Sequence, residues 1–225
     1  MSRIGLIILI LMMSVSVFAQ NPITADSVFQ IHYAANLTLN DSVIDMTNSG
    51  ARGGVSSTGP GGSGTAASEG GSICVNAYVF SPDEQEIACC SCPVTPNALV
   101  SWSVKSDLIS NPLTPAIPTS VIVKLLATVP VGGSCSNSAA DAATATLVPG
   151  LEAWMTTTHV ITSVKPPAWI GQKPTTVLTP VLTETPFTPS TLSASELASV
   201  AERCTNIVGN GSGFGICRSC RLGGQ

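Results

Sequence analysis

Apolar and polar residues alternate in short runs along much of the chain, the pattern of β-strands with one buried face. The clearest signal is a hairpin over residues 73–95. Two runs rich in β-branched and aromatic residues, Ile73–Phe80 and Glu86–Val94, flank the turn segment Ser81–Gln85, which contains proline and aspartate. We expect the rest of the chain to pack around this hairpin.

The register of the hairpin predicts how its cysteines pair. If Phe80 lies opposite Glu86, antiparallel pairing places Cys74 opposite Cys92, within the separation that a disulfide tolerates. The other face is then the core side, and it carries Val75, Ala77, Val79, Ile87 and Cys89. We therefore predict a Cys74–Cys92 disulfide, although a slip of one residue would reverse both faces.

Two adjacent cysteines on the second strand of the hairpin need different partners. Cys89 and Cys90 are neighbours on one strand, so their side chains point to opposite faces. We expect one of them to reach the tail at residues 204–220. Cys204 is itself expected to pair with Cys217 or Cys220.

Further strands and one helix complete the predicted elements. Runs within residues 26–48 predict N-terminal strands, and Ser120–Val129 is the most apolar run, expected at the centre of its sheet. The other predicted strands are Ala98–Val104, Ala143–Val148 and Glu152–Val164. Ser193 is a suitable N-cap for a helix, with Glu196 three residues later completing a capping box. Its expected inward face carries Leu197, Val200, Ala201, Cys204 and Val208.

The first nineteen residues have the features of an export signal. Arg3 precedes the apolar run Ile4–Met13, which is short for a membrane span, and Val17-Phe18-Ala19 fits a small-residue cleavage site. We expect a secreted or extracellular mature chain from Gln20, with cell-surface association as an option and no membrane partner after cleavage. An uncleaved anchor is the alternative.

Composition divides the remaining chain into four segments. They are an N-terminal strand region (20–49), a Gly/Ser-rich linker (50–72), a β-sandwich core (73–192) and a helix with a cysteine-containing tail (193–225). Residues 156–192 contain 11 threonines and 6 prolines, which favours edge strands and extended loops. A stalk or glycosylated spacer is the alternative for this stretch.

Charge and cysteine content narrow the class of protein. Only 10% of residues are charged, and the basic ones are scattered, so nucleic acid is a poor partner. Cysteines behind an export signal predict disulfides, and the candidates are Cys74, Cys89, Cys90, Cys92, Cys135, Cys204, Cys217 and Cys220. The alternative is a zinc ion bound by Cys90, Cys92, Cys217 and Cys220. The CxC spacing of Cys90 and Cys92 and the oxidising compartment expected after export both disfavour it.

The titratable residues do not predict catalysis. Of the two histidines, His32 is expected to face solvent from a strand, and His159 has no partner motif. Asp83, Glu84 and Glu86 are expected on a solvated turn, with a weak calcium site as the alternative. We therefore predict no catalytic residue, no cofactor and no metal.

Three tryptophans offer the one candidate binding surface. Trp102, Trp154 and Trp169 are expected in the core, as is common for tryptophan in β proteins. The alternative is a sugar-binding platform formed by Trp154 and Trp169, because an aromatic face stacks on carbohydrate.

Two stretches carry a resemblance to a known group of proteins. The run ICVNAYVFSPDEQEIACCSCPVTPNALVSWSVKSDLISNPLTP and the tail GFGICRSCRLGGQ are similar to an uncharacterised family of secreted, cysteine-containing proteins from soil bacteria. The resemblance covers most of the mature chain. It implies export and transfers no catalytic or binding residue.

Together these features predict a mainly β protein, an antiparallel β-sandwich stapled by disulfides with a short C-terminal helix. The expected function is a non-enzymatic structural or adhesive role outside the cell. Its expected partners are other copies of itself or surface glycans, and one route to self-assembly has residues 26–48 completing a neighbour's sheet. Pairing of those strands within the chain is the favoured interpretation. A carbohydrate-binding module is the alternative function, and an enzyme of unfamiliar type is the third.

Overall fold

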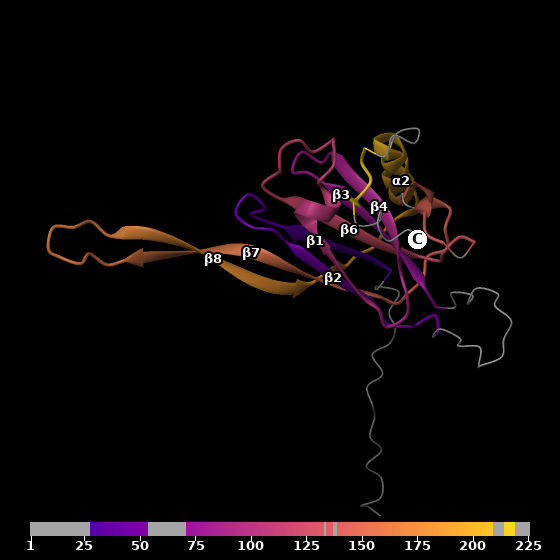
Figure 1. The fold of residues 1–225 in the computed structure, drawn as a ribbon, viewed down its shortest axis with the longest axis horizontal. Coiled ribbons are helices and arrows are strands. Elements are labelled where there is room, and N and C mark those ends of the chain that lie inside the picture. Colours follow the sequence, from indigo (N-terminus) through magenta and orange to yellow (C-terminus); the bar gives the residue numbers. More distant parts are fainter. Residues whose placement is uncertain (1–27, 54–70, 133, 137–138, 209–213, 219–225) are drawn as a thin grey trace, which may run out of the picture.

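The computed structural model describes residues 28–53, 71–132, 134–136, 139–208 and 214–218. These residues form two antiparallel β-sheets that pack face to face, with one long α-helix near the C-terminus (Figure 1). The predicted mainly β fold with a C-terminal helix is confirmed. The predicted export signal and most of the predicted linker lie outside the described residues.

Sheet A contains the predicted hairpin and has the strand order β4-β3-β6-β1-β9. Its strands are β4 (Glu86–Val94), β3 (Ile73–Phe80), β6 (Val121–Thr128), β1 (Phe29–Ala34) and β9 (Thr188–Pro189). The most apolar of the predicted strands forms β6, which lies at the centre of the sheet as predicted.

Sheet B has the strand order β5-β2-β7-β8. Its strands are β5 (Leu99–Ser103), β2 (Val43–Asn48), β7 (Leu151–Lys165) and β8 (Thr175–Pro186). Strand β2 lies between β5 and β7, and β1 lies between β6 and β9 in sheet A. Both N-terminal strands therefore pair within their own chain, which confirms the favoured interpretation of residues 26–48.

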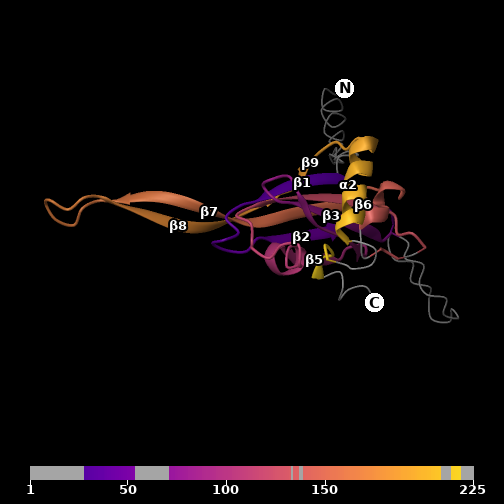
Figure 2. The same cartoon turned by 90° about the horizontal axis from the view of Figure 1, so that it is seen from above.

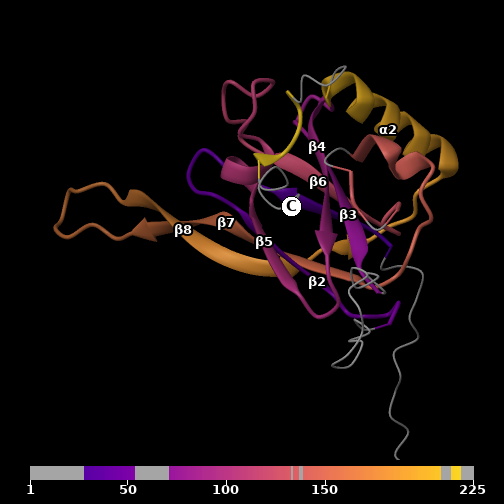
Figure 3. The ribbon, with the colours of Figure 1, turned by 45° about the vertical axis from the view of Figure 1, so that its right-hand side comes forward.

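Sheet A is covered on both faces, so the molecule has three layers. The main core lies between the two sheets and includes Trp102, Leu125 and Met155. A second apolar cluster lies between sheet A and helix α2 (Ala194–Val208), on the other side of the sheet (Figure 3). Because both of its faces are covered, every residue of β3 is buried.

A short 3₁₀ turn replaces one predicted strand. Residues 143–148 do not form a strand; Ala139–Ala143 form the 3₁₀ turn η3, which packs against α2, and Leu147 makes a single bridge to Thr128. Two of the six residues in this run are alanine, which has a weak preference for strands. The prediction at 143–148 was therefore wrong because apolar character alone does not distinguish a strand from a short helical turn.

Helix α2 begins where the capping pattern predicts. Ser193 Oγ accepts a hydrogen bond from the Glu196 backbone N–H at 3.1 Å. The Glu196 carboxylate, however, lies 3.3 Å from Lys124 Nζ on β6, where it forms an ion pair. The cap therefore fixes the helix start, and the ion pair joins the helix to sheet A. Leu197, Val200, Ala201 and Cys204 form the buried face, as predicted.

A β-bulge changes the register of the central hairpin. Phe80 pairs with Glu86 as predicted, but Val79 then pairs with Ala88, which leaves Ile87 as an extra residue on β4. Beyond this bulge, Cys92 lies opposite Val75 and Cys74 lies opposite Pro93. The bulge has the effect of a one-residue slip, so Cys74 and Cys92 face opposite sides of the sheet.

The disulfides follow from that register. Those between described residues join Cys74 to Cys135, Cys89 to Cys204 and Cys90 to Cys217. The predicted Cys74–Cys92 bond and the predicted pairing of Cys204 within the tail are therefore wrong. The prediction that Cys89 was on the core side is also wrong, because the bulge turns it toward α2.

The opposite orientations of the two adjacent cysteines are confirmed. Cys89 points to the α2 layer, whereas Cys90 points into the core between the sheets, where its partner Cys217 is also buried. Both cysteines link sheet A to the C-terminal segment. A zinc site that includes Cys90 and Cys217 is incompatible with their disulfide.

Candidate functional site

The strands β7 and β8 form a long arm that projects from the sandwich (Figures 1 and 2). Strand β2 pairs with β7 only as far as Thr156, whereas the β7–β8 ladder continues to the Lys165–Thr175 pair. At about 3.3 Å per residue, the ladder runs roughly 23 Å beyond Thr158. Every residue from 161 to 184 is exposed. We call residues 159–182 the arm.

The base of the arm is attached to the body by specific contacts. The Asn36 side-chain amide donates a hydrogen bond to the Thr158 carbonyl oxygen at 2.7 Å. His32 Nε2 lies 2.8 Å from Thr185 Oγ1, and its ring packs against Phe187 with centroids 5.0 Å apart. Phe187 is itself buried in the main core. The arm therefore leaves the body from a firmly packed base.

These contacts change the expected environment of His32. The sequence predicts a solvent-facing side chain, but the imidazole is half-buried between β1 and the base of the arm. Burial lowers the pKa of His32, the nearby His159 lowers it further, and a hydrogen bond with the Tyr33 carbonyl opposes both effects. His32 therefore acts as a packing residue at the base of the arm.

The arm exposes an unusual amount of apolar surface for a two-stranded ribbon. Ile170 and Trp169 are exposed at its tip, and both strands carry further exposed apolar side chains. These are Ile161, Val164, Val177, Leu178, Val181 and Leu182. Isolated two-stranded ribbons are marginally stable in water, and large exposed apolar surfaces mark interaction sites. The arm is therefore the first candidate functional site.

The prolines of β8 limit how the arm can bind a partner. Pro180 and Pro186 lie in β8, which is the edge strand of sheet B. Proline has no N–H to donate, so a further strand cannot form a regular ladder along this edge. The proline-containing strands β8 and β9 are edge strands, as predicted, whereas β7 lies between β2 and β8 and forms a long ribbon with β8. Binding through the apolar faces of the arm is favoured over strand addition at β8.

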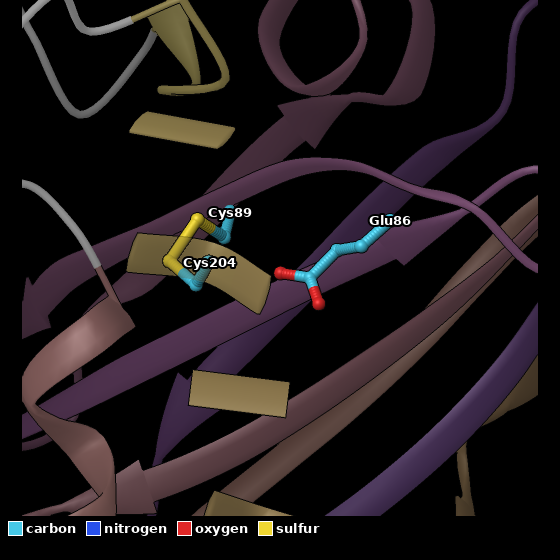
Figure 4. Close-up of side chains that lie close together, drawn as sticks. All are labelled: Glu86, Cys89 and Cys204. Atoms are coloured by element: carbon cyan, nitrogen blue, oxygen red, sulfur yellow. A yellow bond between two sulfur atoms is a disulfide. The ribbon is translucent and has the colours of Figure 1, made fainter. Parts of the chain in front are cut away.

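A second candidate site is a buried carboxyl group beside a disulfide (Figure 4). Glu86, Cys89 and Cys204 bring their ligand-type atoms within 4.8 Å of one another, the one such group of three in the part of the chain that the structure describes. Since the two sulfurs are joined, they offer no thiolate to a metal. The cluster is therefore not a metal site in its oxidised state.

The position of Glu86 differs from the sequence prediction. Asp83 and Glu84 are exposed on the turn, but Glu86 is 93% buried, and neither of its carboxyl oxygens has a hydrogen-bond partner among the described residues. Burial raises the pKa of Glu86 to about 8, against the opposing charges of Arg203 and Lys124. The three carboxylates therefore do not converge as the calcium alternative requires. The sequence offered no signal for this burial, because it results from α2 covering the hairpin.

The described part of the body includes two grooves. One, of about 480 Å³, is lined in part by Tyr33, Phe80, Lys124 and Arg203. Its Lys124 ammonium lies 4.9 Å from the centre of the Phe80 ring and is paired with Glu196. The other, of about 340 Å³, lies beside Cys74, and five of its twelve lining residues are serine or threonine. Neither lining contains a histidine, so neither groove pairs a nucleophile with a histidine base.

The structure separates the three tryptophans. Trp102 is buried in the main core. Trp154 is half-buried on β7, where it lies opposite Asp45 and Pro186 in the body of sheet B. Trp169 is 65% exposed beyond the end of the β7–β8 ladder. The structure therefore does not bring Trp154 and Trp169 together into one sugar-binding platform.

No family model, curated protein or solved structure matches this chain. The disulfides indicate an oxidising environment of the extracellular type. Within the described residues, none of the helices has the length and apolar character needed to cross a membrane.

Proposed function

We propose that this protein is a secreted, non-enzymatic structural or adhesive component that attaches to its partner through the β7–β8 arm. The observation that carries this proposal is the uninterrupted exposure of residues 161–184, with apolar side chains on both strands. Removing such a surface from water is favourable by about 25 cal/mol per Å² of apolar area. A partner that covers the arm would supply that burial.

Three features support a location outside the cell. The first nineteen residues have the pattern of an export signal, and the disulfides persist only in oxidising compartments. The resemblance to secreted proteins of soil bacteria agrees with both. Attachment at the surface of the producing cell is compatible with all three.

Self-assembly through exchange of residues 26–48 is a less favourable route than binding through the arm. Strands β1 and β2 each lie between two neighbours, so exchange would first break two ladders per strand. The arm is already exposed and requires no such opening. The proposed attachment therefore leaves the sandwich intact.

The test compares the exported wild-type protein with an armless variant. In this variant, Asn-Gly replaces residues 160–180 between the directly paired His159 and Val181, since this dipeptide favours a tight hairpin turn. We expect the wild-type protein to associate with the cell surface or an extracellular polymer, and the armless protein to remain free in the supernatant. Fractionation and electron microscopy of the culture provide the measurement. Equal distribution of the two proteins would contradict the proposal.

A carbohydrate-binding role is the second candidate, and the exposure of Trp169 at the tip of the arm favours it. A glycan array with Trp169→Ala and Trp154→Ala tests it. We expect a sugar-binding arm to lose selective binding in Trp169→Ala and to retain it in Trp154→Ala, since the two residues lie far apart. Absence of glycan binding by the wild-type protein would remove this candidate.

A further inference from the structure

The face of sheet B that points away from sheet A has a distinctive set of side chains. The cross-strand register places its outward residues in three rows, which run Leu99–Thr47–Glu152, Ser101–Asp45–Trp154–Pro186 and Ser103–Val43–Thr156–Glu184. Their alternation with fully buried neighbours on β2 and β7 confirms which face they occupy. We call these residues the sheet B outer face.

The sheet B outer face is both acidic and partly apolar. It carries the carboxylates of Asp45, Glu152 and Glu184, and its rows contain no lysine, arginine or histidine. Leu99 is 64% exposed at one edge, and Val43 and Trp154 are partly exposed within the rows. A face of this kind suits a partner that is apolar and positively charged.

The arm has that complementary chemistry. From residue 153 to residue 183 the chain contains no aspartate or glutamate, whereas Lys165 and Lys173 flank the tip. Trp169 and Ile170 lie between these two lysines at the tip, and the other exposed apolar side chains lie along the ribbon between the lysines and the body. One molecule therefore carries a basic apolar projection and an acidic apolar face.

We propose that the arm of one copy docks on the sheet B outer face of a second copy, with Lys165 and Lys173 beside Glu152 and Glu184. This inference rests on the proposed function, since it names the partner of the arm. Lysine stems pack along apolar surface while their ammonium groups reach carboxylates. The apolar side chains of the arm would therefore be buried, and its lysines would be paired with carboxylates.

The size of the arm is adequate for such an interface. At their exposed fractions, its eight large apolar residues present on the order of 1,000 Å² over both faces, so one face together with the tip presents roughly two-thirds of that area. The lysine and threonine side chains of the same face add polar area toward the ~800 Å² per partner of a standard interface. The contact joins two different surfaces, so two copies can close it reciprocally as a dimer or repeat it as a filament. Both arrangements use the same contact.

Direct pairing of two arms is less favourable. Each arm carries two lysines and no carboxylate, so arm-to-arm contact buries apolar surface without compensating its charge. The prolines of β8 also prevent regular pairing along that edge. Docking on the acidic face of a second copy avoids both problems. The face supplies the opposite charge, and it contacts the arm through side chains rather than through strand pairing.

Charge reversal on the purified, oxidised mature protein tests the proposal. The arm variant is Lys165→Glu with Lys173→Glu, and the face variant is Glu152→Lys with Glu184→Lys. All four side chains are exposed, so the fold should be retained. The control reverses two exposed carboxylates elsewhere, Asp141→Lys with Glu202→Lys. Sedimentation velocity over a concentration series measures association, and circular dichroism with a disulfide map verifies the fold.

We expect the wild-type protein to form dimers or longer assemblies. Each of the arm and face variants should associate about tenfold or more weakly at low salt. The control should associate like the wild type. Mixing the two variants should restore association between them, since the acidic arm of one meets the basic face of the other and the unaltered arm meets the unaltered face. A change in folding cannot produce that recovery.

Two results would overturn the inference. One is a wild-type protein that stays monomeric at the highest concentration. The other is a mixture of arm and face variants that associates no better than either variant alone. If the monomeric protein still attaches to cells through its arm, the proposed function stands and only the identity of the partner is wrong. If attachment does not depend on the arm either, the proposed function fails as well.

Discussion

Glu86 lies opposite Phe80 at the end of the β3–β4 hairpin, and its carboxyl group is buried beside the Cys89–Cys204 disulfide (Figure 4). The β-bulge that follows this pair turns Cys89 toward α2, so the carboxyl group and the disulfide share one layer. A buried carboxyl group without a hydrogen-bond partner is favoured in its neutral form. This relationship makes the stability of the protein depend on pH.

The first prediction concerns that pH dependence. The pKa of Glu86 rises from 4.5 to about 8 on folding, so the folded state binds more protons than the unfolded state between these values. The stabilisation is complete below pH 4.5 and is lost as the pH rises through about 8. We expect Glu86→Gln to remove this loss and to be more stable than wild type by ~3–5 kcal/mol at pH 8–9.

Urea unfolding of both proteins at several pH values measures the effect. The difference between them cancels contributions from other groups, including His32, whose lowered pKa costs stability below about pH 6.5 in both proteins. Glu202→Gln, at an exposed site outside the proposed interface, is the matched control, and its profile should follow that of the wild type. Parallel profiles for wild type and Glu86→Gln would show that Glu86 is ionised in the folded state.

The second prediction concerns the remaining disulfide. Six cysteines form the three described pairs, and Cys92 is also disulfide-bonded. Cys220 lies outside the described residues and is the one other cysteine in the sequence. We therefore expect a Cys92–Cys220 bond, which non-reducing peptide mass spectrometry would detect. A peptide that joins Cys74 to Cys92 would instead indicate the unbulged hairpin register.

The third prediction concerns proteolysis of the arm. Exposed loop tips are preferred cleavage sites, and Trp169 is an exposed residue of the kind that chymotrypsin recognises. We expect a single early cut there. The two fragments should remain joined on a non-reducing gel, because the Cys89–Cys204 and Cys90–Cys217 bonds connect them, and should separate after reduction. Early cuts elsewhere in the described sandwich would contradict this expectation.

The fourth prediction concerns the contribution of the arm to folding. Residues 161–184 are exposed throughout and bury little apolar surface. We expect the armless variant to unfold with a free energy within ~1 kcal/mol of the wild-type value when both are monomeric. Phe187→Ala is the matched contrast, since it removes a buried side chain at the base of the arm and should cost ~3–5 kcal/mol. Denaturant titration measures both.

The sequence by itself determined the fold class, most strands and the helix. Alternation of apolar residues located β3, β4 and β6, and a serine cap with helical spacing located α2, because these signals depend on neighbours along the chain. Adjacency alone also required Cys89 and Cys90 to have partners on opposite faces of the sheet. Local signals of this kind can be read from the sequence alone.

Only the tertiary structure decided the disulfide pairing, the burial of Glu86 and the shape of the arm. One extra residue at Ile87 reverses the faces of the following strand, and no local pattern marks that bulge. Glu86 is buried because α2, more than a hundred residues later, covers the hairpin. The strand pattern of residues 151–186 predicted pairing, but no third described strand lies beside the arm because β2 begins only at its Val43–Thr156 pair. These features arise from contacts between distant segments, so they required the folded molecule.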